Sequence, residues 1–223
     1  MPFPGAVTDT ANATLLLSIA AALLYAFALE TPPSPRRTAI KTLAVALLAV
    51  LVFIRSGPPL LIAALGLSAA GDAFLSRDGD ERAFLAGLAS FLAAHLAYVA
   101  LFFLTGGSFG LMIAEPWRAV VALAVALFVV LMLARLWRAV TPDLRVPIAI
   151  YIVAILAMAV TALTVESPAV IIGALLFMAS DAILAAEKFL MASSSPLRRP
   201  ARFAVWALYY AAQLSITAGF LLT

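Results

Sequence analysis

Cysteine is absent from the 223-residue chain, which excludes a disulfide framework, a thiolate metal site and a cysteine nucleophile. The one histidine, His95, supplies too few ligands for a histidine-based metal site. Charged residues make up only 11% of the chain, whereas a soluble domain has roughly 25%. The net charge of +3 is too small and scattered to indicate nucleic-acid binding. We therefore expect no metal, no cofactor and no nucleic-acid partner.

What the chain has instead is apolar side chains, which form 65% of the sequence and give a mean hydropathy of +1.14. A chain of this composition cannot bury all its apolar surface from water, so lipid must be its solvent. The apolar runs are long and continuous, unlike the alternating segments of about ten residues that form membrane barrels. We predict an all-α polytopic membrane helix bundle, a single transmembrane domain over residues 1–223.

Eight apolar runs have the length of a membrane-spanning helix, which is about 20 residues. Many of the prolines lie in the gaps between the runs, where a helix begins or ends. The first run is interpreted as a span and not a signal peptide, because no Lys or Arg precedes it. The predicted spans are 13–29, 38–54, 58–76, 83–104, 118–135, 146–164, 168–187 and 201–222.

The positive charges predict the orientation of these spans. Of the fourteen Lys and Arg residues, twelve lie at the odd-numbered connections, and only Arg55 and Arg118 lie at the other side. Positive residues favour the cytoplasmic face of a membrane. We therefore expect a protein of the cell membrane with both termini outside and four basic connections in the cytoplasm.

A short internal repeat relates the two halves of the chain. Residues 70–75 read AGDAFL and residues 179–184 read ASDAIL, in the third and seventh predicted spans. These spans point the same way, so the pattern indicates a parallel four-plus-four repeat. The alternative is that two small-residue stretches resemble each other by chance in Ala-rich helices.

Two aspartates, Asp72 and Asp181, lie inside these repeated stretches. A charge in the hydrocarbon costs roughly 2.5–3.5 kcal/mol, so such residues usually face the bundle interior and serve a function. At 1.5 Å per residue, they lie ~6 Å and ~9 Å from the cytoplasmic ends of their spans. We predict that they act together, although each could instead pair with a cation or a backbone group in a structural role.

Further polar side chains map near the same depth. Lys41 and Tyr151 lie near the cytoplasmic ends of their spans, and Lys41 could extend to the headgroups, a lipid phosphate or an aspartate. His95 and Tyr98 share a helical face with Phe84, Gly87 and Phe91. Such a stripe is also typical of interhelical packing, and His95 could be an interior histidine with no role as a ligand.

The last predicted span carries a similar stripe, which includes Tyr209 and Gln213. These two side chains lie one to two turns deeper than the aspartates. Together with the preceding residues they would place hydrogen-bonding groups around the two carboxyls in the cytoplasmic half of the bundle.

At these positions the chain resembles the YhhN/TMEM86 family of lysoplasmalogenases. The resemblance runs from about residue 36 to the C-terminus, with its motifs in the family's order and spacing. It rests on Lys41; on Ser68, Gly71, Asp72 and Leu75; on Phe84, Leu85, Gly87, Phe91, His95 and Tyr98; on Gly173, Ala174, Phe177, Ser180, Asp181, Lys188 and Phe189; and on Tyr209, Tyr210, Ala211 and Gln213.

The resemblance implies hydrolysis of the vinyl ether bond of lysoplasmalogen to a fatty aldehyde and a glycerophospho-base. It implies that Asp72 and Asp181 are the catalytic pair. A vinyl ether breaks when its β-carbon is protonated to give an oxocarbenium ion, a chemistry that suits one protonated and one ionised carboxyl. The expected binding or orienting residues are Lys41, His95, Tyr98, Tyr151, Ser180, Tyr209 and Gln213, and the expected partners are membrane lipid and a lysophospholipid substrate.

Three other functions stay open at this point. Buried carboxyls also serve proton-coupled transporters, although the third and seventh spans show no helix broken by Gly or Pro at mid-membrane. The protein could bind lipid without turning it over. A lipid hydrolase acting on an ester or amide is less consistent with the sequence, which contains no Gly-x-Ser-x-Gly motif.

Overall fold

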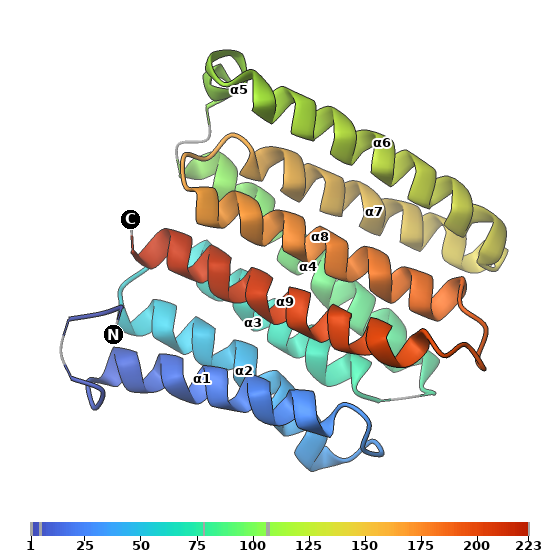
Figure 1. The fold of residues 1–223 in the computed structure, drawn as a ribbon, viewed down its shortest axis with the longest axis horizontal. Helices are drawn as coiled ribbons and strands as arrows, with labels where there is room; N and C mark the ends of the chain where they lie inside the picture. Colours follow the sequence, from blue (N-terminus) through green and yellow to red (C-terminus); the bar gives the residue numbers. More distant parts are fainter. Residues whose placement is uncertain (1, 5, 78, 106–107, 223) are drawn as a thin grey trace.

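The computed structural model describes residues 2–4, 6–77, 79–105 and 108–222, and within these residues all regular structure is helical. The helices lie side by side in one bundle (Figure 1). Their bounds are α1 Thr10–Ala28, α2 Pro35–Ile54, α3 Pro59–Leu75, α4 Glu81–Leu104, α5 Gly110–Ala114, α6 Pro116–Ala139, α7 Pro142–Ala162, α8 Pro168–Phe189 and α9 Arg198–Leu221.

Seven of these helices are long and apolar enough to cross a membrane, namely α1, α2, α4, α6, α7, α8 and α9. The prediction of a polytopic membrane helix bundle is confirmed to this extent. The remaining predicted span, 58–76, corresponds to α3, which is apolar but has only 17 residues. At 1.5 Å per residue this is about 26 Å, slightly less than the hydrocarbon core of roughly 30 Å. The short helix α5 was not predicted.

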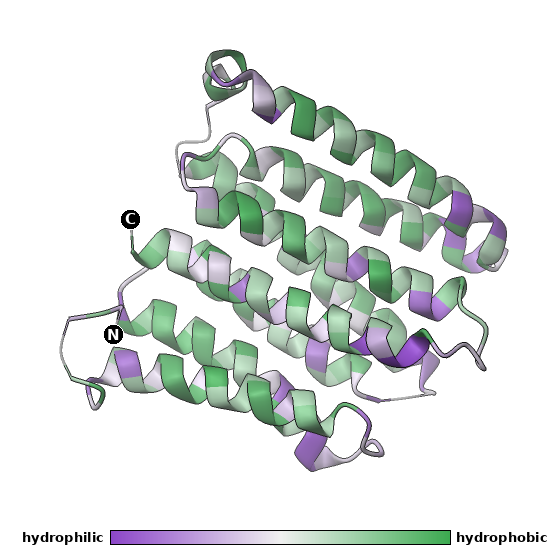
Figure 2. Cartoon of the chain, viewed as in Figure 1, coloured by the Kyte–Doolittle hydropathy of each residue, from purple (hydrophilic) through white to green (hydrophobic). Residues whose placement is uncertain are grey.

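Proline marks the start of most of these helices. Pro35, Pro59, Pro116, Pro142 and Pro168 each occupy the first turn of a helix, where a backbone N–H has no partner to lose. The helices therefore begin a few residues before several of the predicted spans. Hydrophilic residues gather at the helix ends, above all where α1 meets α2, α6 meets α7 and α8 meets α9 (Figure 2). Both chain termini lie at the opposite end (Figure 1).

Glycine allows two helix pairs to pack closely. A Cβ on Gly87 of α4 would lie 2.7 Å from the Leu75 side chain of α3. A Cβ on Gly173 of α8 would lie 2.9 Å from the backbone oxygen of Ala212 in α9. These contacts are below van der Waals distance, so only glycine fits. Since α3 and α8 carry the two aspartates, the close pairs α3–α4 and α8–α9 hold both carboxyls in the packed interior.

The apolar core has two parts. The larger cluster joins α1, α2, α3, α4, α8 and α9, with contributions from α7. A smaller cluster lies between α6 and α7 and includes Val129, Leu136, Val140, Ile148 and Ile152. Helix α6 therefore lies at the edge of the bundle, as Figure 1 shows, and is attached through a separate apolar layer.

Candidate active site

A cavity of about 570 Å³ extends from the bundle interior to the end where α8 meets α9. Its lining comes from α1, α2, α3, α4, α7, α8 and α9 and from the connections at that end. Of the residues that the sequence predicts for the site, the cavity is lined by Lys41, Asp72, Ser180, Asp181 and Tyr209. The structure thus brings the two aspartates from different halves of the chain to one cavity.

Asp72 lies on α3 with both carboxyl oxygens occupied. The ammonium of Lys41 on α2 lies 3.0 Å from Oδ1, and the hydroxyl of Tyr209 on α9 donates to Oδ2 at 2.8 Å. The Asp72 side chain is 1% exposed. A buried carboxylate is stable only when it is paired and hydrogen-bonded, and both conditions are met here. Asp72 is therefore placed to stay ionised.

Asp181 lies on α8 in a different environment. The Tyr151 hydroxyl donates to its Oδ2 at 2.8 Å, and His95 Nε2 lies 3.4 Å from the same oxygen. The other ring nitrogen of His95, Nδ1, lies 2.6 Å from the carbonyl oxygen of Phe91, which assigns the Nδ1 proton to that bond. Within the described residues, no hydrogen bond satisfies the buried Nε2.

This geometry favours a proton between the two groups. A histidine protonated only at Nδ1 presents a lone pair at Nε2, and an ionised Asp181 would present another at Oδ2. Two facing acceptors in a buried position repel each other. A proton on either the carboxyl or Nε2 would remove this repulsion, so the Asp181–His95 pair is suited to hold one transferable proton.

The surroundings of the two carboxyls are built in the same way. Each carboxyl is contacted by one residue from the helix directly before it, Lys41 on α2 or Tyr151 on α7. Each is also contacted by one residue from the last helix of the other half, Tyr209 on α9 or His95 on α4. The two halves of the chain therefore complete each other's carboxyl site.

Three predicted orienting residues have other partners. The Tyr98 hydroxyl donates to Gln213 Oε1, which links α4 to α9 in the core, and neither residue lines the cavity. Ser180 lines the cavity, yet its hydroxyl donates to the carbonyl oxygen of Val205 at 2.9 Å. In the described part of the chain none of the three forms a hydrogen bond with either carboxyl. Their contacts indicate helix packing.

A basic rim at the cavity mouth was missed by the sequence reasoning. We define it as Arg37, Arg77, Lys188 and Arg202, all of which line the cavity. The sequence signal was present, because these residues belong to the basic connections. We interpreted those connections only as an orientation signal, since nothing in the sequence shows that they converge.

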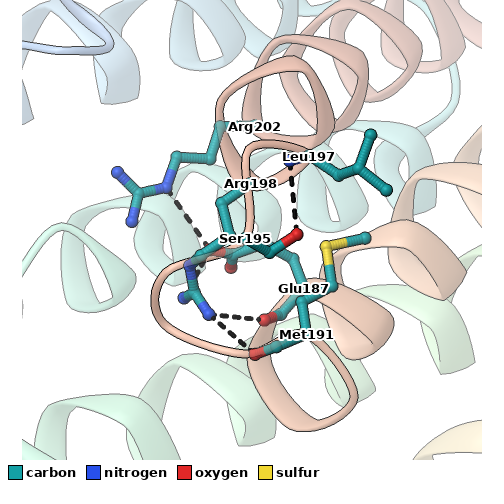
Figure 3. Close-up of polar contacts among 6 residues, drawn as sticks. All are labelled: Glu187, Met191, Ser195, Leu197, Arg198 and Arg202. Carbon is teal, nitrogen blue, oxygen red and sulfur yellow. Dashed lines mark hydrogen bonds and ion pairs between the residues drawn. The ribbon is translucent and has the colours of Figure 1, made fainter.

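Glu187 organises one side of this mouth, as Figure 3 shows. Its carboxylate lies 2.6 Å from Arg198 Nη2 and 3.4 Å from Nε of Arg202. Arg198 also donates from Nη1 to the carbonyl oxygens of Glu187 and Met191, both at 3.1 Å. These bonds close the α8–α9 connection and hold the first turn of α9 against the end of α8.

Aromatic side chains shape the interior of the cavity. Gly71, next to Asp72, leaves room for the Phe91 ring, because a Cβ there would lie 2.6 Å from ring atoms. Phe91 in turn packs edge-to-face against Tyr209, with ring centroids 5.7 Å apart. On the other side, Lys41 lies over the Tyr25 ring at 5.8 Å. These contacts fix the orientation of the two groups that hold Asp72.

The arrangement can supply a proton and an anion to one bound molecule. Asp72 is paired with a lysine, and Asp181 is placed to share a proton with His95. Within the described residues, no group of three or more His, Asp and Glu side chains is placed to hold a metal ion. The two contacts place a possible proton donor in the same cavity as a paired carboxylate.

Comparison with known proteins identifies the family of the chain. Neither the curated proteins nor the solved structures show a significant match. The YhhN family model matches residues 36–220, a range that contains both aspartates and every residue that contacts them. The chain belongs to the YhhN family.

Proposed function

We propose that this protein is a lysoplasmalogenase-like hydrolase, which cleaves the vinyl ether bond of a lysophospholipid to a fatty aldehyde and a glycerophospho-base. The observation that carries the proposal is the contrast between the two carboxyls of one cavity. Asp72 is paired with Lys41 at 3.0 Å, whereas Asp181 lies 3.4 Å from a histidine that has a lone pair to offer. Family membership and the resemblance support the same reaction.

We further propose how the bundle lies in the membrane. Helices α1 to α4 and α6 to α9 all cross the cell membrane. The bilayer becomes thinner around α3, which is shorter than the others. Both termini are outside, and the basic connections and the cavity mouth face the cytoplasm. The reciprocal contacts of the two carboxyls support a parallel four-plus-four repeat, in which α1–α4 correspond to α6–α9. The substrate's head then lies in the cytoplasmic half of the bundle.

The assigned chemistry has three steps, which are protonation, addition of water and collapse of the hemiacetal. In the first, the proton held by Asp181 and His95 goes to the β-carbon of the vinyl ether, and the electron pair of the double bond forms the new C–H bond. The resulting oxocarbenium ion is stabilised by the carboxylate of Asp72, as in glycoside hydrolysis. In the second, water adds to the cationic carbon and returns a proton to the Asp181–His95 pair. The hemiacetal collapses to the aldehyde and the glycerol hydroxyl.

The other contacts have supporting roles in this scheme. Lys41 and Tyr209 keep Asp72 ionised and oriented, so Lys41 acts on a carboxylate and not on a lipid phosphate. Tyr151 holds Oδ2 of Asp181 toward the histidine. The basic rim, and not Lys41, then binds the phosphate of the lipid head group, because arginine and lysine both bind phosphate oxygens.

The test is aldehyde release from lysoplasmenyl-ethanolamine and lysoplasmenyl-choline by purified protein in detergent. Asp72→Asn and Asp181→Asn should each lower turnover by about 10²–10⁴-fold, the usual contribution of a positioned acid or base. Asp143→Asn is the matched control, since Asp143 is exposed at the start of α7. A folded wild type that releases no aldehyde contradicts the proposal, and so does full activity without both carboxyls. Detergent removes the two compartments that a transporter needs, so turnover there also separates an enzyme from a carrier.

A further inference from the structure

A buried acid at the cavity mouth, Glu187, holds two arginines in different ways. All three side chains line the cavity. Arg198 lies 2.6 Å from the Glu187 carboxylate and also donates from Nη1 to two backbone carbonyl oxygens. The guanidinium of Arg198 is therefore taken up by the α8–α9 connection, and its role there is to close the loop.

Arg202 keeps most of its donors. Among the described residues, its side chain donates one hydrogen bond, from Nε to Oε1 of Glu187 at 3.4 Å. The two terminal nitrogens are turned away from that carboxylate, as Figure 3 shows. The Arg202 side chain is 49% exposed and lines the cavity. The structure thus presents a guanidinium that is held at Nε and has Nη1 and Nη2 available to a ligand.

The charges at this side of the mouth favour an anion. Two arginines face one carboxylate, which leaves a net charge of +1 on the three residues. A planar guanidinium offers two parallel N–H groups that match a pair of phosphate oxygens, which a lysine ammonium cannot do. Lys188 of the same rim lies instead over the Phe84 ring, with its ammonium 3.8 Å from the centroid. Arg202 is therefore better placed than Lys188 for a directed contact with phosphate.

The position of Arg202 along the bundle matches the length of a lysophospholipid head. Its Nε contacts Glu187, which follows Asp181 by six residues on α8, about 9 Å along the helix axis at 1.5 Å per residue. In a 1-alkenyl lysophospholipid, seven bonds separate the β-carbon of the vinyl ether from phosphorus. At ~1.2 Å per bond these span roughly 8 Å. A phosphate at Arg202 thus places the reactive bond at the depth of Asp181.

We infer that Arg202 binds the phosphate of the lysophospholipid, that Glu187 positions its guanidinium, and that this contact restricts the substrate to alkenyl ether lipids with a phosphate one glycerol unit from the vinyl ether. The assignment deepens the proposed function and rests on it for the position of the reactive bond. It also divides the basic rim, because Arg202 makes a directed contact and the other rim residues contribute charge. An alkenylglycerol has the same vinyl ether but cannot make this contact.

Equilibrium binding in detergent tests the phosphate contact without any reaction. The probes are a 1-O-alkyl lysophosphatidylethanolamine, which has no vinyl ether, and the 1-O-alkylglycerol of the same chain, which has no phosphate. Arg202→Gln should raise the Kd of the phospholipid about tenfold or more and leave that of the alkylglycerol unchanged, because only the first lipid loses a charge-assisted pair. Arg199→Gln is the matched control, since Arg199 is 74% exposed on the same helix. An equal loss for both lipids, or no loss relative to the control, overturns the inference.

The positioning role of Glu187 has a test of its own. Glu187→Gln removes a negative charge from the mouth, so a rim that acted by charge alone would bind the phospholipid more tightly. Positioning predicts the opposite, a Kd raised about threefold or more, because an amide holds the arginine more weakly than a carboxylate does. Tighter binding would therefore contradict the role of Glu187. Inorganic phosphate is the last probe, and binding as tight as that of the lipid would mean that the site takes a free anion and not a lipid head.

Kinetics separate this inference from the proposed reaction. With a 1-alkenyl lysophosphatidylethanolamine, Arg202→Gln should raise KM about tenfold and change kcat less than about twofold, as expected for a contact that substrate and transition state share. With the 1-alkenylglycerol, variant and wild type should behave alike. If no substrate releases aldehyde, the proposed reaction fails and the binding result still decides the phosphate contact. If aldehyde is released and the variant leaves KM unchanged, the phosphate contact is wrong and the reaction stands.

Discussion

Loss of the Lys41 charge should destabilise the protein far more than the loss of an ion pair at the surface would. The proposed change is Lys41→Met, which keeps the length of the side chain and removes the ammonium 3.0 Å from Asp72. Asp72 is 1% exposed and would remain as an unpaired charge in the interior. Removal of one partner of a buried pair costs roughly 3–5 kcal/mol. Lys41 is 15% exposed and faces a sizeable cavity, so we expect the lower end, about 3 kcal/mol.

A double-mutant cycle isolates the pair from the rest of the core. In Lys41→Met with Asp72→Asn neither charge remains, and the amide oxygen can still accept from Tyr209. Asp72→Asn alone should cost about 1 kcal/mol, because Lys41 lines the cavity and can then turn toward water. We expect the double variant to be only about 1–2 kcal/mol less stable than wild type, so the three values give a coupling energy of roughly 2–3 kcal/mol between the two sites. Replacement of both members of a buried pair is often close to neutral, whereas replacement of one is not.

The assay is denaturant unfolding in detergent micelles, followed by far-UV circular dichroism. Arg36→Met serves as the control, because Arg36 is exposed in the first turn of the same helix. Its effect should stay within about 0.5 kcal/mol. If Lys41→Met is as stable as the control, or if the cycle is additive within about 0.5 kcal/mol, Asp72 is not held by Lys41 and the assignment of Asp72 as the ionised carboxyl is wrong.

Three further predictions concern other parts of the structure. Tyr151→Phe should lower aldehyde release about tenfold or more and cost only about 1 kcal/mol in unfolding, because it removes one hydrogen bond to Asp181; equal turnover would contradict its positioning role. Gly173→Ala should destabilise the bundle by about 1–3 kcal/mol, because the added methyl group forces α8 away from α9. Gly66 has open space around it, so Gly66→Ala should stabilise α3 by up to about 1 kcal/mol. The same unfolding assay measures both changes. Hydrogen bonds from the neighbouring Arg118 and Trp117 side chains lower the pKa of Glu115. The stability that Glu115 adds is therefore complete above its ordinary pKa of 4.5 and is lost as the pH falls below that value. Glu115→Gln should remove this part of the dependence of the unfolding free energy on acid pH.

Several parts of the site could be predicted because they depend on membrane physics alone. Asp72 and Asp181 stand out because an acidic residue in an apolar run is costly and needs a partner. Tyr151, His95 and Tyr209 were found by helical periodicity and depth, and the structure places all three against the carboxyls. Tyr98 and Gln213 satisfied the same criteria but bond each other, since periodicity shows which face a residue shares and not which neighbour it meets.

The basic residues show the opposite limit. Their positions at the connections were visible, yet their convergence at a cavity mouth was not, because that depends on how α2, α3, α8 and α9 pack. Lys188 and Arg202 come from α8 and α9, and Arg37 and Arg77 come from the first half of the chain. The apolar cavity of about 90 Å³ between α4, α6, α7 and α8 was equally hidden. Apolar residues that line a cavity have the same sequence pattern as apolar residues that face lipid.

By itself, then, the sequence determined the solvent of this protein, the positions and apolar character of its helices and the identity of its two buried acids. These features follow from the cost of placing polar groups in hydrocarbon, which each segment meets independently of the others. Only the tertiary structure decided that Asp72 pairs with a lysine and Asp181 with a histidine, and that a small apolar cavity lies beside Asp181. Those features depend on contacts between different helices, within one half of the chain for Asp72 and Lys41 and between the halves for Asp181 and His95. No single helix contains them.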